Sequence, residues 1–509
     1  MKNSARPVPV GPATQICGML SAALFATALL APATADDKAG QAGQSRPNIL
    51  FAIADDWGWP HASAYGDPVV KTPTFDRLAR EGALFRHAYI SSPSCTPSRG
   101  AILTGQWHWR LKGAGNLWSV FPDEFVTYPE LLKQAGYEVG VSSKGWGPGR
   151  PETPGRELEG KRFRNFQQFL DQRQPDKPFC YWLGTSDPHR PFKRGSGAAV
   201  GMPLDRVHLF GCFPDHPDVR GDVADYYVEV QRFDQLVGAA LKSLEEIGQL
   251  DNTIVAMTGD HGMPFPRCKS NLYDSGARVP LAIRFPGSGK PGRTLDDFVS
   301  LTDLAPTFLE LAGITLPADM TGRSLTGLLT SQQSGRIEPQ RDFVLIGKER
   351  HVPGQETPDM GGYPCRAIRT HQYLYIRNFE PDRWPAGTPN YDQAAIPGAW
   401  LADCDNGPTK TYMWENRDKD DAHRRLYELS FGKRPAEELY DVEKDPEQLN
   451  NVAADPQYAE IRDKLAKQLT AELEKTGDPR VVGGGEQFDR FPYLGGAPKF
   501  PGWRPSGKR

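Results

Sequence analysis

The sequence has few cysteines and no Cys-x-x-Cys pair. Seven occur among 509 residues, and without closely spaced pairs a structural zinc site is not expected. Cys17 lies in an N-terminal apolar segment, and Cys95 stands in a motif described below. The remaining five are an odd number, so at most two disulfides can form and their pairing stays open. These five are Cys180, Cys212, Cys268, Cys365 and Cys404.

The sequence also lacks an excess of positive charge. The formal net charge is -3 at pH 7, so binding to nucleic acid is not expected. Beyond the N-terminal segment no apolar run is long enough to form a membrane-spanning helix. There is no internal repeat, glycine repeat or proline tract, although Gly (52) and Pro (46) are numerous. These residues therefore indicate many loops around a conventional core.

The first 35 residues are typical of a signal peptide. Lys2 and Arg6 precede a short apolar run at 18–31, and Ala33-Thr34-Ala35 supplies small residues for cleavage. A retained membrane anchor is the alternative, but the run is short for a bilayer span. We therefore expect export to the periplasm or the medium, with no membrane association after cleavage.

Several apolar segments end at polar clusters. Strands are predicted at 46–54, 179–184 and 253–258, and they run into Asp55-Asp56, Ser186–His189 and Gly259–Gly262. Helices are predicted at 73–85, from 98 to about 105, and at 222–247. Strands alternating with helices predict an α/β fold with a site at the carboxyl ends of the strands.

The pattern changes after about residue 362. Short strand-like pieces such as 373–376 are followed by a charged helical segment at 457–475. We predict a catalytic domain at 36–362, a smaller C-terminal α+β domain at 363–480, and an irregular tail at 481–509. A chain of this length suits one large domain and one smaller one.

The acidic strand ends indicate a metal site. Adjacent carboxylates such as Asp55 and Asp56 repel one another unless a cation lies between them. Oxygen ligands suit calcium or magnesium. A turn or helix cap is the alternative for Asp55-Asp56, but Asp260-His261 at a second strand end favours the metal.

One segment carries a long and specific motif. Residues 95–105 read Cys-Thr-Pro-Ser-Arg-Gly-Ala-Ile-Leu-Thr-Gly. This segment resembles the signature of the sulfatase family, C-x-P-S-R followed by x-x-x-L-T-G, and every fixed position matches. The resemblance begins at Pro47-Asn48-Ile49-Leu50 and reaches Glu438-Leu439-Tyr440-Asp441, so it covers nearly the whole mature chain.

The resemblance implies both a fold and a chemistry. The fold would be an alkaline-phosphatase-like α/β sandwich with a large central mixed sheet and a small C-terminal domain. A maturation enzyme would oxidise Cys95 to formylglycine, whose hydrate has one hydroxyl to attack sulfur and a second to expel sulfate. One calcium ion would be held by Asp55, Asp56, Asp260, His261 and the modified Cys95. The other catalytic residues would be Arg99, Lys144, His189 and Lys269.

Alternatives stay open for several of these residues. Lys144 and Lys269 could be solvated surface charges, His189 could be a structural hydrogen-bonding residue, and Cys95 could be buried or disulfide-bonded. Many family members have a histidine two residues after the first lysine, where this chain has Trp146. His261 stands where Asn is common, and its nitrogen suits calcium less well than an amide oxygen.

Within the family, the heparan N-sulfatase branch is the most similar. The similarity lies in Gly262–Pro266, Asn271–Tyr273 and Asp187–Arg190. It implies a sulfated saccharide substrate, specifically N-sulfoglucosamine, with Arg190 as a substrate contact or else a structural ion-pair partner. An O-sulfatase on a polysaccharide or an arylsulfatase is the main alternative. A phosphoesterase or phosphonate hydrolase, and a non-catalytic glycan-binding protein, are further alternatives that the intact motif disfavours.

Overall fold

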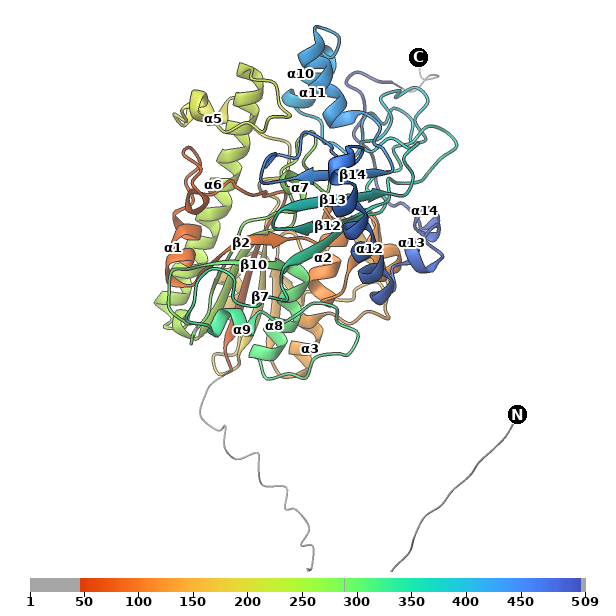
Figure 1. Ribbon diagram of the computed structural model, residues 1–509. Coiled ribbons are helices and arrows are strands. Elements are labelled where there is room, and N and C mark those ends of the chain that lie inside the picture. Colours follow the sequence, from red (N-terminus) through yellow and green to blue (C-terminus); the bar gives the residue numbers. More distant parts are fainter. Residues whose placement is uncertain (1–45, 288, 505–509) are drawn as a thin grey trace, which may run out of the picture. The chain divides into compact units, whose positions relative to one another are not determined.

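A computed structural model describes residues 46–287 and 289–504 (Figure 1). The predicted signal peptide lies outside the described residues. The described residues form one compact unit. Within the described ranges, no helix is both long and apolar enough to cross a membrane. The six cysteines in these ranges are buried free thiols.

The core is an eight-stranded mixed sheet, as the resemblance implied. Only β9 runs antiparallel to its neighbours, β2 and β8. The strands predicted from the sequence at 46–54, 179–184 and 253–258 are β1, β7 and β8, with β1 between the other two. In spatial order the strands are β10 (Arg293–Ser300), β2 (Ala83–Tyr89), β9 (Leu281–Arg284), β8 (Thr253–Gly259), β1 (Asn48–Ala54), β7 (Phe179–Gly184), β4 (Glu138–Ser142) and β6 (Lys161–Phe163).

Helices cover both faces of this sheet, which explains why its central strands are apolar throughout. Alternate residues of β1 enter different cores, Phe51 in one and Leu50 in the other. The Leu50 face packs against α1 (Pro73–Glu81) and α6 (Pro217–Glu246). The Phe51 face packs against α2 (Cys95–Thr104), α3 (Tyr128–Gln134) and α8 (Leu304–Leu311).

Two predicted helix boundaries were wrong. The helix predicted at 73–85 ends at Glu81, and 83–89 is strand β2. The helix stops because Gly82 takes φ -133° and ψ -126°, outside the helical region. Glycine is needed there, since a side chain would meet the Ile283 carbonyl oxygen at 2.1 Å. The long helix begins at Pro217, five residues before the predicted start, because His216 caps it and proline suits the first turn.

A second, four-stranded antiparallel sheet lies C-terminal to the first. Its order is β11 (Phe343–Lys348), β12 (Cys365–Thr370), β13 (Tyr373–Asn378) and β14 (Glu437–Asp441). Leucines of α12 (Ala459–Lys475) pack on it. This is the predicted smaller sheet with its charged helix, although β11 precedes residue 362 and the domain boundary stays a prediction.

Short elements complete the fold. A two-stranded parallel ribbon joins β3 (Ser119–Phe121) and β5 (Gly149–Pro151). The remaining α-helices are α4 (Phe166–Gln172), α5 (Ser196–Ala199), α7 (Asp274–Ala277), α9 (Thr326–Thr330), α10 (Pro408–Glu415), α11 (Asp421–Phe431), α13 (Pro479–Val482) and α14 (Gln487–Arg490).

Candidate active site

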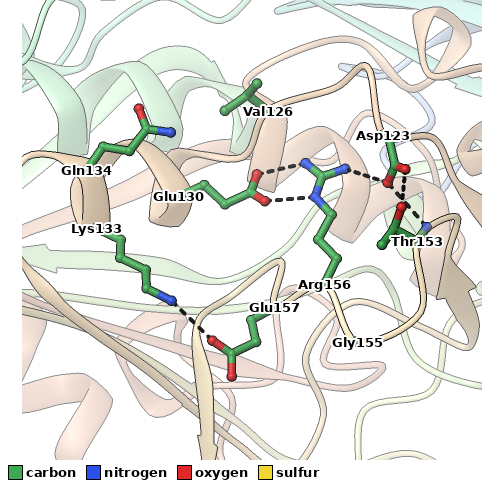
Figure 2. Close-up of a pocket in the computed structure, with 9 residues that line it drawn as sticks. All are labelled: Asp123, Val126, Glu130, Lys133, Gln134, Thr153, Gly155, Arg156 and Glu157. Atoms are coloured by element: carbon green, nitrogen blue, oxygen red, sulfur yellow. Dashed lines mark hydrogen bonds and ion pairs between the residues drawn. The ribbon is translucent and has the colours of Figure 1, made fainter.

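An open surface hollow of about 760 Å³ lies between α3 and the loop at 153–157 (Figure 2). Its charged side chains are paired with one another. Arg156 donates to Glu130 at 2.7 Å, and Lys133 donates to Glu157 at 3.2 Å. Because these groups satisfy one another, the hollow presents no convergent set of reactive groups.

A second cavity, of about 480 Å³, collects the residues singled out in the sequence. Parallel pairing of β1 with β8 aligns Ala54 with Gly259. The acidic pairs Asp55-Asp56 and Asp260-His261 therefore emerge side by side. The loop after β7 lies next to them, since the Asp55 amide donates to the Asp187 carbonyl at 3.0 Å.

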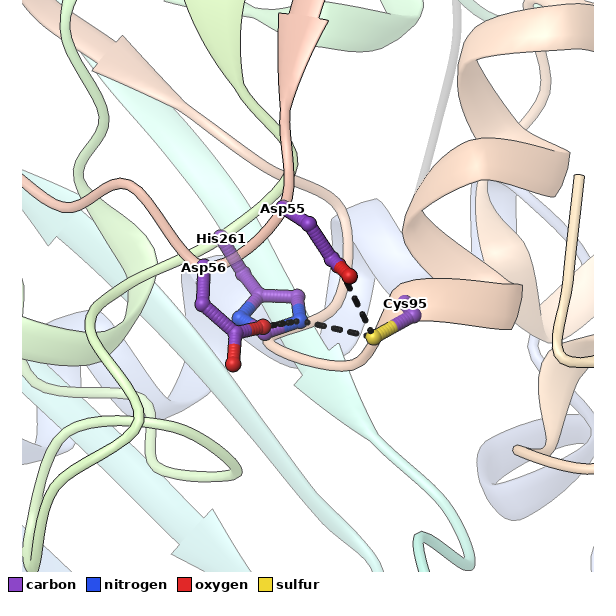
Figure 3. Close-up of side chains that lie close together, drawn as sticks. All are labelled: Asp55, Asp56, Cys95 and His261. Carbon is purple, nitrogen blue, oxygen red and sulfur yellow. Dashed lines mark hydrogen bonds and ion pairs between the residues drawn. The ribbon is translucent and has the colours of Figure 1, made fainter. Parts of the chain in front are cut away.

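Cys95 occupies the first turn of α2 and points at this strand edge (Figure 3). Its Sγ lies 3.2 Å from His261 Nε2 and 3.6 Å from Asp55 Oδ1. The side chain is 2% exposed, and burial raises the pKa of the thiol well above its usual value. An unmodified Cys95 is therefore a protonated thiol and a poor nucleophile.

Arg99 lies one turn further along α2 and is fully buried. Its Nε donates to Asp260 Oδ2 at 2.8 Å, and Nη1 donates to the Lys144 and Gly145 carbonyls at 3.1 Å each. Burial raises the pKa of Asp260, but His261 and Arg99 together hold it below its usual value. Arg99 thus fixes one strand end and the backbone that carries Lys144.

Two lysines place their ammonium groups at the cavity. Lys144 Nζ donates to Asp55 Oδ1 at 2.5 Å. Lys269 Nζ donates to Asp56 Oδ2 and to Asp405 Oδ2, both at 2.9 Å. Burial lowers the pKa of Lys269, but Asp405 and Asp56 raise it well above its usual value. Both side chains line the cavity and neither is a solvated surface charge.

His189 also lines the cavity, and its side chain is 33% exposed. Its Nδ1 lies 2.6 Å from the Arg190 carbonyl, which can only accept. Nδ1 therefore carries the proton in a neutral ring. Nε2 is left facing the site, 3.9 Å from Asp56 Oδ2.

Four residues could hold a metal ion (Figure 3). One ligand atom from each of Asp55, Asp56, Cys95 and His261 lies within 4.8 Å of the others. Asp56 Oδ1 is buried, accepts no hydrogen bond within the described ranges, and lies 3.1 Å from His261 Nε2. His261 Nδ1 lies 3.0 Å from the Gly262 carbonyl and donates its proton there. Nε2 therefore keeps its lone pair, which points toward the ligand atoms of Asp55, Asp56 and Cys95. A divalent cation fits this donor set.

Asp260, the remaining ligand that the resemblance implied, is outside that group. Its Oδ2 receives the Arg99 hydrogen bond, and its Oδ1 accepts from the Asp56 amide at 2.8 Å. Its role as a ligand stays a prediction.

Arg190 is turned away from the cavity. It donates to both carboxylate oxygens of Asp222 at 2.8 Å and to the Pro264 carbonyl at 3.0 Å. The guanidinium is 7% exposed and lies over the rings of Phe192 and Phe265. These contacts fit the structural ion pair that the sequence left as an alternative.

The sequence did not reveal other residues of the cavity wall. Asp405 binds Lys269, and His351 Nδ1 lies 2.7 Å from Ser94 Oγ beside Cys95. Trp146 takes the position of the absent histidine, and its indole donates to the Thr96 carbonyl at 3.1 Å. Trp118 lines the same cavity. Apart from Trp146, which the family comparison had singled out as a departure, no motif marked these residues, because they come from loops whose approach depends on tertiary packing.

Comparison with known families gives two matches. The model described as sulfatase matches residues 47–149 and 151–314. The model described as N-sulphoglucosamine sulphohydrolase, C-terminal, matches residues 259–385. The second segment includes His261 and Lys269 and the cavity residues His351 and Val352.

Among curated proteins, N-sulphoglucosamine sulphohydrolase from Homo sapiens is 30% identical, covering 86% of this chain and 92% of that protein. An ulvan-active sulfatase from Formosa agariphila is 27% identical, covering 85% and 81%. An N-acetylglucosamine-6-O-sulfatase from Bacteroides thetaiotaomicron is 26% identical, covering 56% and 71%.

Solved structures share the fold at lower identity. BT4656, solved in complex with its substrate D-glucosamine-2-N,6-O-disulfate, superposes with a TM-score of 0.59 at 21% identity, covering 85% of this chain and 99% of that one. A phosphonate monoester hydrolase from Agrobacterium radiobacter gives 0.61 at 19% identity, covering 86% and 97%.

Proposed function

The chain belongs to the sulfatase family, and on that premise we propose that it removes the N-sulfate group of a terminal glucosamine in heparan-type saccharides. One observation carries the substrate class. The segment similar to the C-terminal region of N-sulphoglucosamine sulphohydrolases supplies part of the wall of the Cys95 cavity. Trp118 and Trp146 lie outside that segment and also line the cavity.

The proposed nucleophile is formylglycine made from Cys95 by a maturation enzyme. Support comes from the complete family signature and from the buried thiol, whose raised pKa leaves it unreactive as it stands. A hydrated aldehyde would supply the attacking hydroxyl and a second hydroxyl that lets sulfate leave.

The proposed cofactor is one calcium ion. Asp55, Asp56 and His261 would hold it. Asp56 Oδ1 is buried without a hydrogen bond and faces His261 Nε2 at 3.1 Å, which supports a cation between them. The carboxylate oxygens favour calcium, whereas the imidazole nitrogen favours a softer metal. Metal analysis of the active protein identifies the ion. Its chemistry would be to polarise sulfate oxygens and lower the pKa of the nucleophile.

The protein's own groups then take complementary roles. Lys144 and Lys269 offset the negative charge of the sulfate group. His189 presents Nε2 at the cavity and, in its doubly protonated form, is the candidate donor of a proton to the departing nitrogen. Arg99 positions Asp260 and the Lys144 backbone.

The proposed location is outside the cytoplasm. The charged start, short apolar run and small residues within 1–35 support export. Sequencing the N-terminus of the mature protein, together with cell fractionation, tests this. A mature protein that retains residues 18–31 contradicts it.

A substrate panel tests the activity. Sulfate release is measured from N-sulfoglucosamine, glucosamine 6-O-sulfate and 4-nitrophenyl sulfate, with a phosphonate monoester as a fourth substrate. We expect N-sulfoglucosamine to give the highest kcat/KM, because the segment similar to N-sulphoglucosamine sulphohydrolases lines the cavity and an aryl sulfate lacks the sugar hydroxyls that would supply binding energy. The Cys95→Ala variant measures the background. Faster release from an O-sulfate would reassign the enzyme as an O-sulfatase.

A further inference from the structure

Asp405 brings a carboxylate from the C-terminal part of the chain into the cavity. It stands just before α10 and lines the same wall as Lys144 and His189. Its Oδ2 accepts from Lys269 at 2.9 Å. Its Oδ1 has no hydrogen-bond partner among the described residues, and the side chain is 21% exposed. One acceptor oxygen is therefore open to whatever occupies the cavity.

The segment that carries Asp405 is held in place. Lys410 Nζ donates to the carbonyls of Leu401 and Cys404 at 3.1 and 2.8 Å. Two residues before Asp405, Asp403 accepts from Lys348 at 2.9 Å. These buried contacts fix the backbone around Asp405, so its carboxylate has a defined position in the cavity wall.

A carboxylate in this position needs an explanation, because the sulfate group is itself an anion. Burial raises the pKa of Asp405, but the adjacent Lys269 ammonium holds it well below its usual value. Two negative groups in one cavity repel. That unfavourable contact is offset when the ligand presents a hydrogen-bond donor to the open oxygen.

A sulfamate has such a donor and a sulfate ester does not. The nitrogen of N-sulfoglucosamine carries a hydrogen, whereas the bridging oxygen of an O-sulfate carries none. In hydrolysis the S–N bond breaks and its electron pair stays on nitrogen. Sulfur bonds to the nucleophile oxygen, whose proton passes to water, and the nitrogen takes one proton from protonated His189 and leaves as an amine. A second proton, taken from water, converts the amine to an ammonium, which a nearby carboxylate stabilises.

Asp405 is close to the group that can deliver this proton. Single ligand atoms of Asp405, His189 and Asp56 all lie within 4.8 Å of one another. A departing nitrogen that reaches His189 Nε2 is therefore also close to the Asp405 carboxylate.

We propose that Asp405 accepts the sulfamate N–H and then the ammonium of the product, and that it thereby makes this enzyme prefer N-sulfate over O-sulfate. This inference rests on the proposed function and adds the residue that selects its substrate.

Kinetics of Asp405→Asn test the preference. We expect kcat/KM for N-sulfoglucosamine to fall roughly 10- to 100-fold, the usual effect of losing a charge-assisted hydrogen bond. Release from glucosamine 6-O-sulfate should stay unchanged or rise. Asp403→Asn is the matched control: it breaks another buried lysine–aspartate pair in the same segment and should leave the ratio of the two rates unchanged. Equal losses on both substrates would show that Asp405 acts only through Lys269 and would overturn the inference, as would no loss at all.

A binding experiment separates this inference from the proposed function. Calorimetry on the Cys95→Ala protein compares glucosamine, which carries an ammonium, with N-acetylglucosamine, which does not. We expect glucosamine to bind about tenfold more tightly, and Asp405→Asn to abolish that difference. If the wild-type enzyme hydrolyses only O-sulfates, the proposed function fails, but an Asp405-dependent preference for glucosamine still supports an amine site. No preference for glucosamine overturns the inference whatever the enzyme hydrolyses.

Discussion

Replacing Arg190 with Met tests whether this residue serves stability or substrate binding. The guanidinium makes a bidentate ion pair with the Asp222 carboxylate, with both N···O distances 2.8 Å, and donates to the Pro264 carbonyl. Removing one partner of a buried pair costs about 3–5 kcal/mol, because the other charge is left unpaired. Asp222 keeps two hydrogen bonds from Thr409, at 3.1 and 2.7 Å. We therefore expect the lower value, about 3 kcal/mol.

The assay is urea unfolding of the full chain followed by tryptophan fluorescence, alongside kcat and KM for N-sulfoglucosamine. The free energy of unfolding should fall while KM stays within about threefold of the wild type, since the side chain does not line the cavity. Arg194→Met is the control, because that side chain is 77% exposed in its pair with Asp218. Its loss should change stability by less than about 1 kcal/mol.

A double variant sharpens the result. Adding Asp222→Asn removes the unpaired charge, so the double variant should be no less stable than Arg190→Met alone. An unchanged unfolding midpoint in Arg190→Met, together with a KM raised about tenfold or more, would refute the ion-pair reasoning and restore Arg190 as a substrate contact.

Three further predictions follow from the site and its surroundings. Cys95→Ala should remove turnover and leave the thermal midpoint nearly unchanged. Wild-type activity in this variant, expressed with a maturation enzyme, would contradict the role of residue 95 as the nucleophile. Chelation of divalent cations, or Asp56→Ala, should lower kcat/KM about tenfold or more. Chelation should also lower the thermal midpoint, because an ion bound only by the folded state stabilises that state. Active protein without a stoichiometric cation would count against a metal at this site. Burial raises the pKa of Asp67, but the neighbouring His61, 3.7 Å away, and a hydrogen bond from the Tyr227 hydroxyl at 2.6 Å bring it down from 3.8 to about 2. Its carboxylate therefore contributes stability above about pH 4 that is lost as the pH falls toward 2, up to about 2 kcal/mol. The stability gap between wild type and Asp67→Asn should narrow from pH 6 to pH 3 in urea unfolding, and a constant gap would disprove the assignment.

The sequence predicted the strand-end part of the site well. Asp55, Asp56, Asp260 and His261 follow two strands, and parallel neighbours present their carboxyl ends at the same edge. The family motif added Cys95, and the structure brings it within hydrogen-bonding distance of His261. Local pattern and motif were sufficient here because each residue sits directly on a regular element or its end.

The remaining wall of the site could not be predicted in the same way. Asp405 meets Lys269 across 136 residues of chain, and it lies in a loop with no strand or helix periodicity to orient it. Arg190 follows the strand-end histidine directly, yet packing against Phe192 and Phe265 turns it toward Asp222. Side-chain direction in such loops is decided by distant partners, which a single sequence does not reveal.

The burial of Cys95 also fixes the order of events in making this enzyme. Cys95 is 2% exposed and lies between the start of α2 and the acidic strand ends. Another protein therefore cannot reach the thiol once the sheet has formed. Any oxidation by a maturation enzyme must therefore happen on the unfolded or nascent chain. Under the proposed maturation, a molecule that folded first would keep its thiol, with a normal unfolding curve and no turnover. Specific activity would then report how folding and maturation competed during biosynthesis, and purified inactive protein would regain function only after unfolding and treatment.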